Sequence, residues 1–239
     1  MFIFIRLYLA HCLGDFPFQT NHIFKLKQKG LRGVFLHVLI IVLCCLALAW
    51  PYLSNPLVLT FIGFIGITHV IQDHLKLRFS NPKSQFWLYL LDQACHVGII
   101  ALLFLTDIRN LPAPQGGPDL FVSLYRNDQL MIRTIILILT TYNGFFLMES
   151  FKTSFTGNLQ RYDPFVKWYG MFERALIALS FLAGDHAFLF MALILLARPA
   201  VFTFFKDHLK SPGKLLATEE ISLGWTIGML GGLAMVICA

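Results

Sequence analysis

The sequence predicts an all-α, polytopic transmembrane helix bundle of about eight helices, with both termini external. Hydrophobic residues make up 57% of the 239 positions and charged residues only 13%, which is unlike a soluble protein. Apolar windows of about 20 residues recur, and each is long enough to cross the hydrocarbon core. Basic loops alternate with loops that lack excess positive charge, as the positive-inside rule describes. We therefore expect a single integral membrane domain over residues 1–239.

Eight apolar windows are candidate membrane spans. In chain order they cover residues 2–18, 33–51, 56–75, 86–106, 129–149, 166–183, 186–205 and 219–238. The first is the weakest, because it contains Arg6, His11 and Asp15. We expect it to form a short or tilted helix that its neighbours shield from lipid.

The basic stretch KLKQKG between the first two spans sets the orientation, because Lys and Arg concentrate in cytoplasmic loops. Each later loop agrees with alternation from this starting point. The stretch itself is either a solvated turn or an amphipathic segment on the anionic inner leaflet. The net charge of +6 is explained by such loops, so we do not expect nucleic-acid binding.

Two neighbouring spans each carry a histidine and an aspartate one helical turn apart. His69 precedes Asp73 by four residues, and Asp92 precedes His96 by the same interval. This spacing puts both members of a pair on one helix face. Ionisable groups are costly inside a membrane and commonly mark function there, although a polar pair can also simply hold helices together.

Further polar residues are predicted at the same depth. His11, Asp15 and Gln19 form a stripe in the first span, and His37 lies about one turn into the second. The loop charges place all these groups, with the two pairs, in the cytoplasmic leaflet. The first four helices should therefore form one polar site, with the last four as a supporting half.

Four imidazoles and three carboxylates suit Zn²⁺, Mn²⁺ or Fe²⁺. They exceed the needs of one tetrahedral ion. They would suit two ions, or one ion with further carboxylates that orient the histidines. The predicted metal ligands are His11, Asp15, His37, His69, Asp73 and His96.

The remaining site residues are assigned to catalysis. Asp92 is expected to ligate the metal or to act as general base. Gln19, Gln93 and Arg174 would orient a leaving group or stabilise developing negative charge, and Glu173 accompanies Arg174 in this set.

Downstream charges have two interpretations. Arg174 and Arg198 could hold a phosphate or carboxylate through paired hydrogen bonds. Alternatively, these residues and Glu149, Glu173, Glu219 and Glu220 are interfacial charges that fix helix packing, which is the preferred interpretation for Glu149, Glu219 and Glu220.

The pattern LAHCLGDFPFQTNHIFKLKQKGLRGVFLHVLI, followed by THVIQDHLK, DQACH, FERALIAL and EEISLGWTIG, resembles an uncharacterised family of small bacterial membrane proteins. The resemblance covers nearly the whole chain. The residues at family-type positions are His11, Asp15, Gln19, His37, His69, Asp73, Asp92, Gln93, His96, Glu173 and Arg174. The chain departs from the pattern at Arg198-Pro199, where a Lys-Ser pair is expected. More loosely, the His/Asp spacing is similar to that of predicted membrane-bound metal-dependent hydrolases.

The leading functional hypothesis is an intramembrane metal-dependent hydrolase in the bacterial inner membrane, acting on a lipid or lipid-linked substrate from the inner leaflet. A divalent-metal or proton transporter is an alternative, but the outer half of the predicted bundle has few polar residues to complete a path. A non-enzymatic membrane partner, whose polar cluster only joins helices, is a third possibility.

Overall fold

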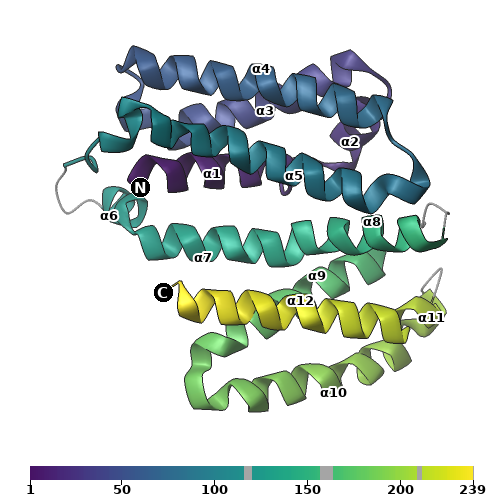
Figure 1. Ribbon diagram of the computed structural model, residues 1–239. Helices are drawn as coiled ribbons and strands as arrows, with labels where there is room; N and C mark the ends of the chain where they lie inside the picture. Colours follow the sequence, from purple (N-terminus) through teal and green to yellow (C-terminus); the bar gives the residue numbers. More distant parts are fainter. Residues whose placement is uncertain (116–119, 157–163, 209–211, 239) are drawn as a thin grey trace. The chain divides into compact units, whose positions relative to one another are not determined.

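The protein is helical throughout the described residues. The computed structural model describes residues 1–115, 120–156, 164–208 and 212–238, and these contain helices and no β-strand (Figure 1). The prediction of an all-α helical bundle is therefore confirmed for this part of the chain. The chain divides into two compact units, a first unit of Met1–Ile135 and a second unit of Ile136–Ala239, which are described separately below.

Six helical stretches among the described residues are long and apolar enough to cross a membrane, which supports a membrane protein. They are Leu31–Leu48, Pro56–Arg78, Pro82–Leu105, Asp128–Thr156, Pro164–Phe205 and Thr218–Ile237. The 42-residue stretch contains two of the predicted spans, which meet near Gly184, where φ is +58°. Seven of the eight predicted windows therefore correspond to these stretches, although the windows 33–51, 86–106 and 219–238 extend one to three residues beyond them.

The remaining window is α1 (Phe2–Asp15), the central helix of the first unit. At 14 residues it is about 21 Å long, short of the roughly 30 Å hydrocarbon core. Its buried residues include Arg6, His11 and Asp15. The expectation of a short helix shielded by its neighbours is confirmed, although the helix ends before the predicted boundary at residue 18.

Four further helices surround or adjoin α1 in the first unit (Figure 1). They are α2 (Asn21–Gln28), α3 (Leu31–Leu48), α4 (Pro56–Arg78) and α5 (Gln85–Ala101). Helix α1 lies closely against α3 at Gly14, where an added Cβ atom would come within 2.7 Å of the Ile41 side chain. This close approach lets the last turn of α1 reach the first turns of α3.

Shorter elements complete the first unit. They are η1 (Trp50–Tyr52), η2 (Pro82–Ser84), η3 (Leu102–Leu105), η4 (Asp107–Asn110) and α6 (Leu120–Arg126), and α7 (Asp128–Ile138) continues into the second unit. The hydroxyl of Tyr52 donates to the Pro112 carbonyl at 2.7 Å, and that of Tyr125 donates to the Leu48 carbonyl at 2.7 Å. These bonds gather η1, α6 and the chain after η4 at one end of the unit.

The two ends of the first unit differ in chemistry. An apolar core fills the end that contains the start of α1 and includes Leu7, Ile41, Ile62 and Leu103, all at most 2% exposed. At that end, Arg6 is fully buried and pairs with Asp128. The opposite end contains the polar cluster described below.

The second unit consists of a π-helical turn and four longer helices, with short elements between them. They are η5 (Leu139–Asn143), α8 (Gly144–Thr156), α9 (Pro164–Ser180), η6 (Phe181–His186), α10 (Ala187–Phe205), η7 (Lys206–His208), α11 (Pro212–Leu215) and α12 (Thr218–Ile237). Helix α12 packs on α9 through glycine: a Cβ atom at Gly228 would lie 2.9 Å from the Ile177 side chain.

Candidate metal centre

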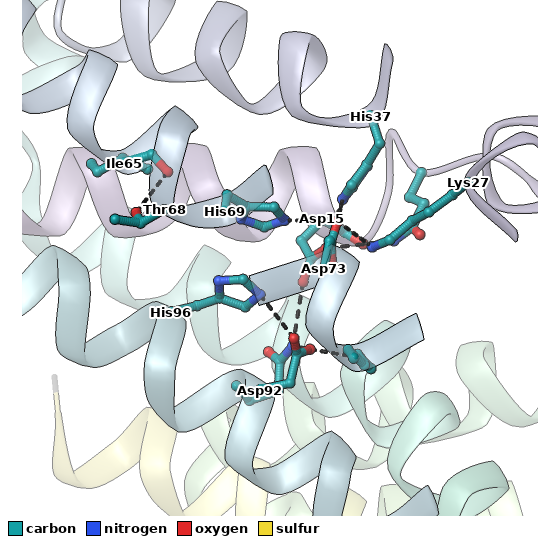
Figure 2. Close-up of polar contacts among 12 residues, drawn as sticks. Asp15, Lys27, His37, Ile65, Thr68, His69, Asp73, Asp92 and His96 are labelled. Carbon is teal, nitrogen blue, oxygen red and sulfur yellow. Dashed lines mark hydrogen bonds and ion pairs between the residues drawn. The ribbon is translucent and has the colours of Figure 1, made fainter. Parts of the chain in front are cut away.

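Four helices of the first unit bring seven ionisable side chains into one buried cluster, here called the His/Asp cluster; Figure 2 labels its members except His11. Its members are His11 and Asp15 of α1, His37 of α3, His69 and Asp73 of α4, and Asp92 and His96 of α5. Each member is at most 8% exposed. The predicted convergence of these residues is therefore observed.

Helical geometry explains how the local pairs form. The i,i+4 spacing stacks His69 over Asp73 on one face of α4 and Asp92 under His96 on one face of α5. The His69 Nε2 atom lies 3.4 Å from Asp73 Oδ2, and His96 Nε2 lies 3.3 Å from Asp92 Oδ1. Both faces are turned toward α1, which brings its own residues between them.

The four imidazole rings form a continuous group. The rings of His69 and His96 stack with centroids 4.0 Å apart and an interplanar angle of 12°. The His11 ring lies 4.9 Å from that of His96 and 5.4 Å from that of His69. The His37 ring lies 5.3 Å from the His69 ring on another side. Imidazole rings from α1, α3, α4 and α5 therefore lie next to one another, with neighbouring ring centroids 4.0–5.4 Å apart.

Carboxylates connect the histidines across helices. The Nε2 atom of His37 lies 3.1 Å from Asp15 Oδ1 and 3.7 Å from Asp73 Oδ2. The amide of Gln93 donates to Asp15 Oδ2 at 3.3 Å and to Asp92 Oδ2 at 3.3 Å. Asp15 therefore occupies the middle of a network that reaches α3 and α5.

The predicted site residue Gln19 also lies at the cluster. Its amide donates to the backbone carbonyl of Asp15 at 2.6 Å and approaches Asp15 Oδ1 at 3.5 Å. It contacts the turn that ends α1, and so it is placed to position Asp15.

Two lysines form ion pairs with carboxylates of the His/Asp cluster, and neither was predicted as a site residue. The Nζ atom of Lys27 lies 2.7 Å from Asp73 Oδ2, and that of Lys76 lies 2.6 Å from Asp92 Oδ2. Lys27 lies in the stretch KLKQKG, and its side chain is 9% exposed. The interpretation of this stretch as a solvated turn is wrong at Lys27, because α2 folds back and buries that side chain beside α4.

The sequence contains a signal for only one of these lysines. Lys76 follows His69 by seven residues and Asp73 by three, so all three share a helix face. Lys27 carries no such signal, because its partner lies 46 positions away in the chain and its neighbours Lys25 and Lys29 are exposed.

The donor set fits a metal ion. Possible ligand atoms of Asp15, His37 and His69 lie within 4.8 Å of one another, as do those of His69, Asp73 and His96. Ligands held about 2.1 Å from one ion lie at most about 4.2 Å apart, so small side-chain rotations would complete either set. Buried polar atoms normally have partners, yet both ring nitrogens of His11 and Nδ1 of His69 have no hydrogen-bond partner among the described residues.

Glu173 and Arg174 lie in the second unit, where both side chains bond to protein groups. Arg174 donates from Nε to the Thr140 carbonyl and from Nη2 to the Thr141 carbonyl, each at 3.1 Å. These carbonyls belong to the π-helical turn η5, so the buried guanidinium supports an irregular piece of backbone. A role for either residue in the His/Asp cluster remains a prediction.

The second unit supports the packing interpretation of its charges. Arg198 donates from Nε and Nη2 to the Glu173 carboxylate at 2.9 and 2.5 Å, and from Nη1 to the Leu215 carbonyl at 2.8 Å. Lys152 pairs with Glu220. Because its three nitrogens already donate to protein groups, Arg198 does not support the alternative of an anion site.

The fold and the cluster define a helical membrane protein whose first unit has a buried His/Asp cluster. Residues 3–115 match the sequence model of a family described as "Protein of unknown function (DUF3307)". No curated protein and no solved structure matches the chain. The matched range contains all seven members of the His/Asp cluster with Gln19 and Gln93, and it ends before FERALIAL and EEISLGWTIG. The similarity to an uncharacterised family is thus shown for the first part of the chain.

Proposed function

We propose that the His/Asp cluster binds one or two divalent metal ions, of Zn, Mn or Fe, and that the protein is an intramembrane metal-dependent hydrolase of a lipid or lipid-linked substrate. The observation that carries this proposal is the convergence of four imidazoles and three carboxylates in one buried site where imidazole nitrogens have no hydrogen-bond partner. A buried, unsatisfied polar atom is costly, and a ligated ion would remove that cost.

Each residue has a role that follows from its contacts. His11, His37, His69 and His96, with Asp15 and Asp73, supply the ligands. When bound, a divalent ion lowers the pKa of a coordinated water and polarises the scissile bond.

Two residues beside the ligands support the reaction. Asp92 orients His96 and is placed to accept a proton as general base. The Gln93 amide donates to both Asp15 and Asp92, and these hydrogen bonds fix the position of Asp92, the proton acceptor, relative to the ligand Asp15.

The place of the cluster within the first unit favours a lipid substrate. It lies toward the end where α2, with Lys25 and Lys27, and the connection between α4 and α5 are found; Arg78 ends α4 and Lys83 lies in that connection. The positive-inside rule assigns such loops to the cytoplasm, which puts the centre in the cytoplasmic leaflet of a bacterial inner membrane. A lipid headgroup or an ester bond at that depth would reach it by lateral diffusion.

Transport by the same groups has less support. A transport path needs polar groups along the whole span. Beyond the cluster, the described core of the first unit consists mainly of apolar side chains, such as Ile3, Leu7 and Leu103. Arg6 is also buried there, but it is paired with Asp128. Polar groups gathered at one end of the unit fit an enzyme better than a transport path.

A purely structural cluster would use its polar groups to bond neighbouring helices. The two ring nitrogens of His11 make no hydrogen bond among the described residues, so this side chain contributes little to such bonding. The His11 ring instead lies beside the stacked rings of His69 and His96, within reach of a ligand shared with them.

Metal analysis of the purified protein tests the proposal. We expect stoichiometric transition metal in the wild type and its loss in His69→Ala. His74→Ala is the matched control, because His74 lies on the same helix but is exposed, and it should retain the metal. A wild-type protein that binds no divalent transition metal, either as purified or after titration, would rule out the metal centre.

A further inference from the structure

Two lysines beside the His/Asp cluster form ion pairs with carboxylates that the proposed metal centre requires. Lys27 contacts Asp73, a predicted ligand, and Lys76 contacts Asp92, the predicted base. An aspartate oxygen that ligates a metal ion has less negative charge to offer an ammonium group. Ligation of a metal ion by Asp73 would therefore weaken its pairing with Lys27 and leave that ammonium group available to another anion.

The charge balance changes sign when a metal ion is bound. With neutral imidazoles, three buried carboxylates and two ammonium groups leave one unit of negative charge. A single divalent ion turns this into one unit of positive charge. Uncompensated charge is expensive in a buried membrane site, so the loaded centre would favour a ligand that carries one negative charge.

On the basis of the function proposed above, we propose that this ligand is a phosphate group of the phosphodiester type. When Asp73 ligates the metal ion, Lys27 moves from Asp73 to bind this phosphate group. A phosphodiester carries a single negative charge at neutral pH and is the common anionic group of membrane lipids. Lysine is a frequent phosphate ligand because its ammonium is a compact charge on a flexible stem.

The position of Lys27 suits this exchange. Lys25 of α2 and Lys29, which follows the helix, are exposed at the surface of the first unit, whereas the Lys27 side chain extends inward to Asp73 (Figure 2). The ammonium therefore lies between the surface and the ligands. Lys76 approaches from the last turns of α4 and supplies a second positive charge at Asp92.

The test uses detergent-solubilised full-length protein loaded with Mn²⁺, and the phosphorus-31 resonance of added probes. A phosphate bound near Mn²⁺ is broadened by its paramagnetism, so binding is measured without an activity assay. The probes are dihexanoylphosphatidylglycerol and inorganic phosphate. We expect Mn²⁺-dependent broadening with the wild type and at least tenfold weaker affinity in Lys27→Met.

Control variants separate this effect from net charge and misfolding. Lys25→Met removes the same charge from an exposed position of α2 and should bind like the wild type. Lys27→Arg keeps a cation and should retain most of the binding even if Lys27→Met folds poorly. Tighter binding of the phospholipid assigns the site to a lipid headgroup, and equal affinity assigns it to free phosphate.

The possible failures can be distinguished. If the wild type binds Mn²⁺ but broadens neither probe, or if Lys27→Met and Lys27→Arg both match the wild type, the phosphate inference is wrong and the metal centre stands. If the wild type does not bind Mn²⁺ or any other divalent transition metal, both proposals are wrong.

Discussion

Buried charge is used differently in the two units. In the second unit, Arg198 is bonded to Glu173 and to the Leu215 carbonyl, and Arg174 is bonded to the carbonyls of a π-helical turn. In the first unit, the ring nitrogens of His11 have no partner among the described residues. A buried ionisable side chain therefore supports packing where its hydrogen bonds are completed within the protein, as at Arg174 and Arg198, and indicates a ligand where they are not, as at His11.

The largest expected effect tests the functional side of this contrast. Asp92→Asn should lower the kcat for hydrolysis of short-chain lipid esters or phosphodiesters by about 10²–10⁴-fold, because the amide cannot accept the proton. Metal stoichiometry should change little, since the proposed role of Asp92 is that of general base and not of metal ligand. The measurement is a product-release assay on metal-loaded protein, with chelator-treated wild type as the inactive reference. Unchanged kcat in the variant would remove Asp92 from the mechanism.

The next effect tests the structural side. Glu173→Leu leaves the Arg198 guanidinium buried without its carboxylate, and we expect a loss of stability of about 3–5 kcal/mol. Thermal or denaturant unfolding in detergent measures it. The double variant Glu173→Leu with Arg198→Met should recover most of the loss, because it removes both charges. A single variant that unfolds like the wild type would contradict the packing role of this pair.

A smaller change in stability is expected from a substitution that tests how α2 packs in the first unit. A Cβ atom at Gly33 would lie 2.0 Å from the Leu26 carbonyl oxygen, so Gly33→Ala must shift the backbone of α2. We expect a destabilisation of about 1–3 kcal/mol by thermal unfolding, as for other overpacked sites.

Gly63→Ala is the matched control for Gly33→Ala. It adds a methyl group in α4 where no atom lies within 4 Å, and it should be neutral or stabilise by up to about 1 kcal/mol. If the two substitutions were equivalent, α2 would not be held against α3 as the structure shows.

Much of the site was accessible from sequence because its signals are local. The spacing of His69 with Asp73 and of Asp92 with His96 follows from helix periodicity alone. Loop charges then predicted a common depth for these pairs, and the structure does bring them together with His11 and His37. The lengths of the helices were also mostly predictable, except that α1 ends at Asp15.

The amino-acid sequence by itself determined the helical class, the apolar spans and the faces on which the His/Asp pairs lie. These properties depend on residues within one or two helical turns. Only the tertiary structure decided that Lys27 is buried beside Asp73 and that Arg198 is bonded to Glu173. In each case the partners lie at least 25 positions apart, and their meeting depends on how helices pack, which no local periodicity encodes.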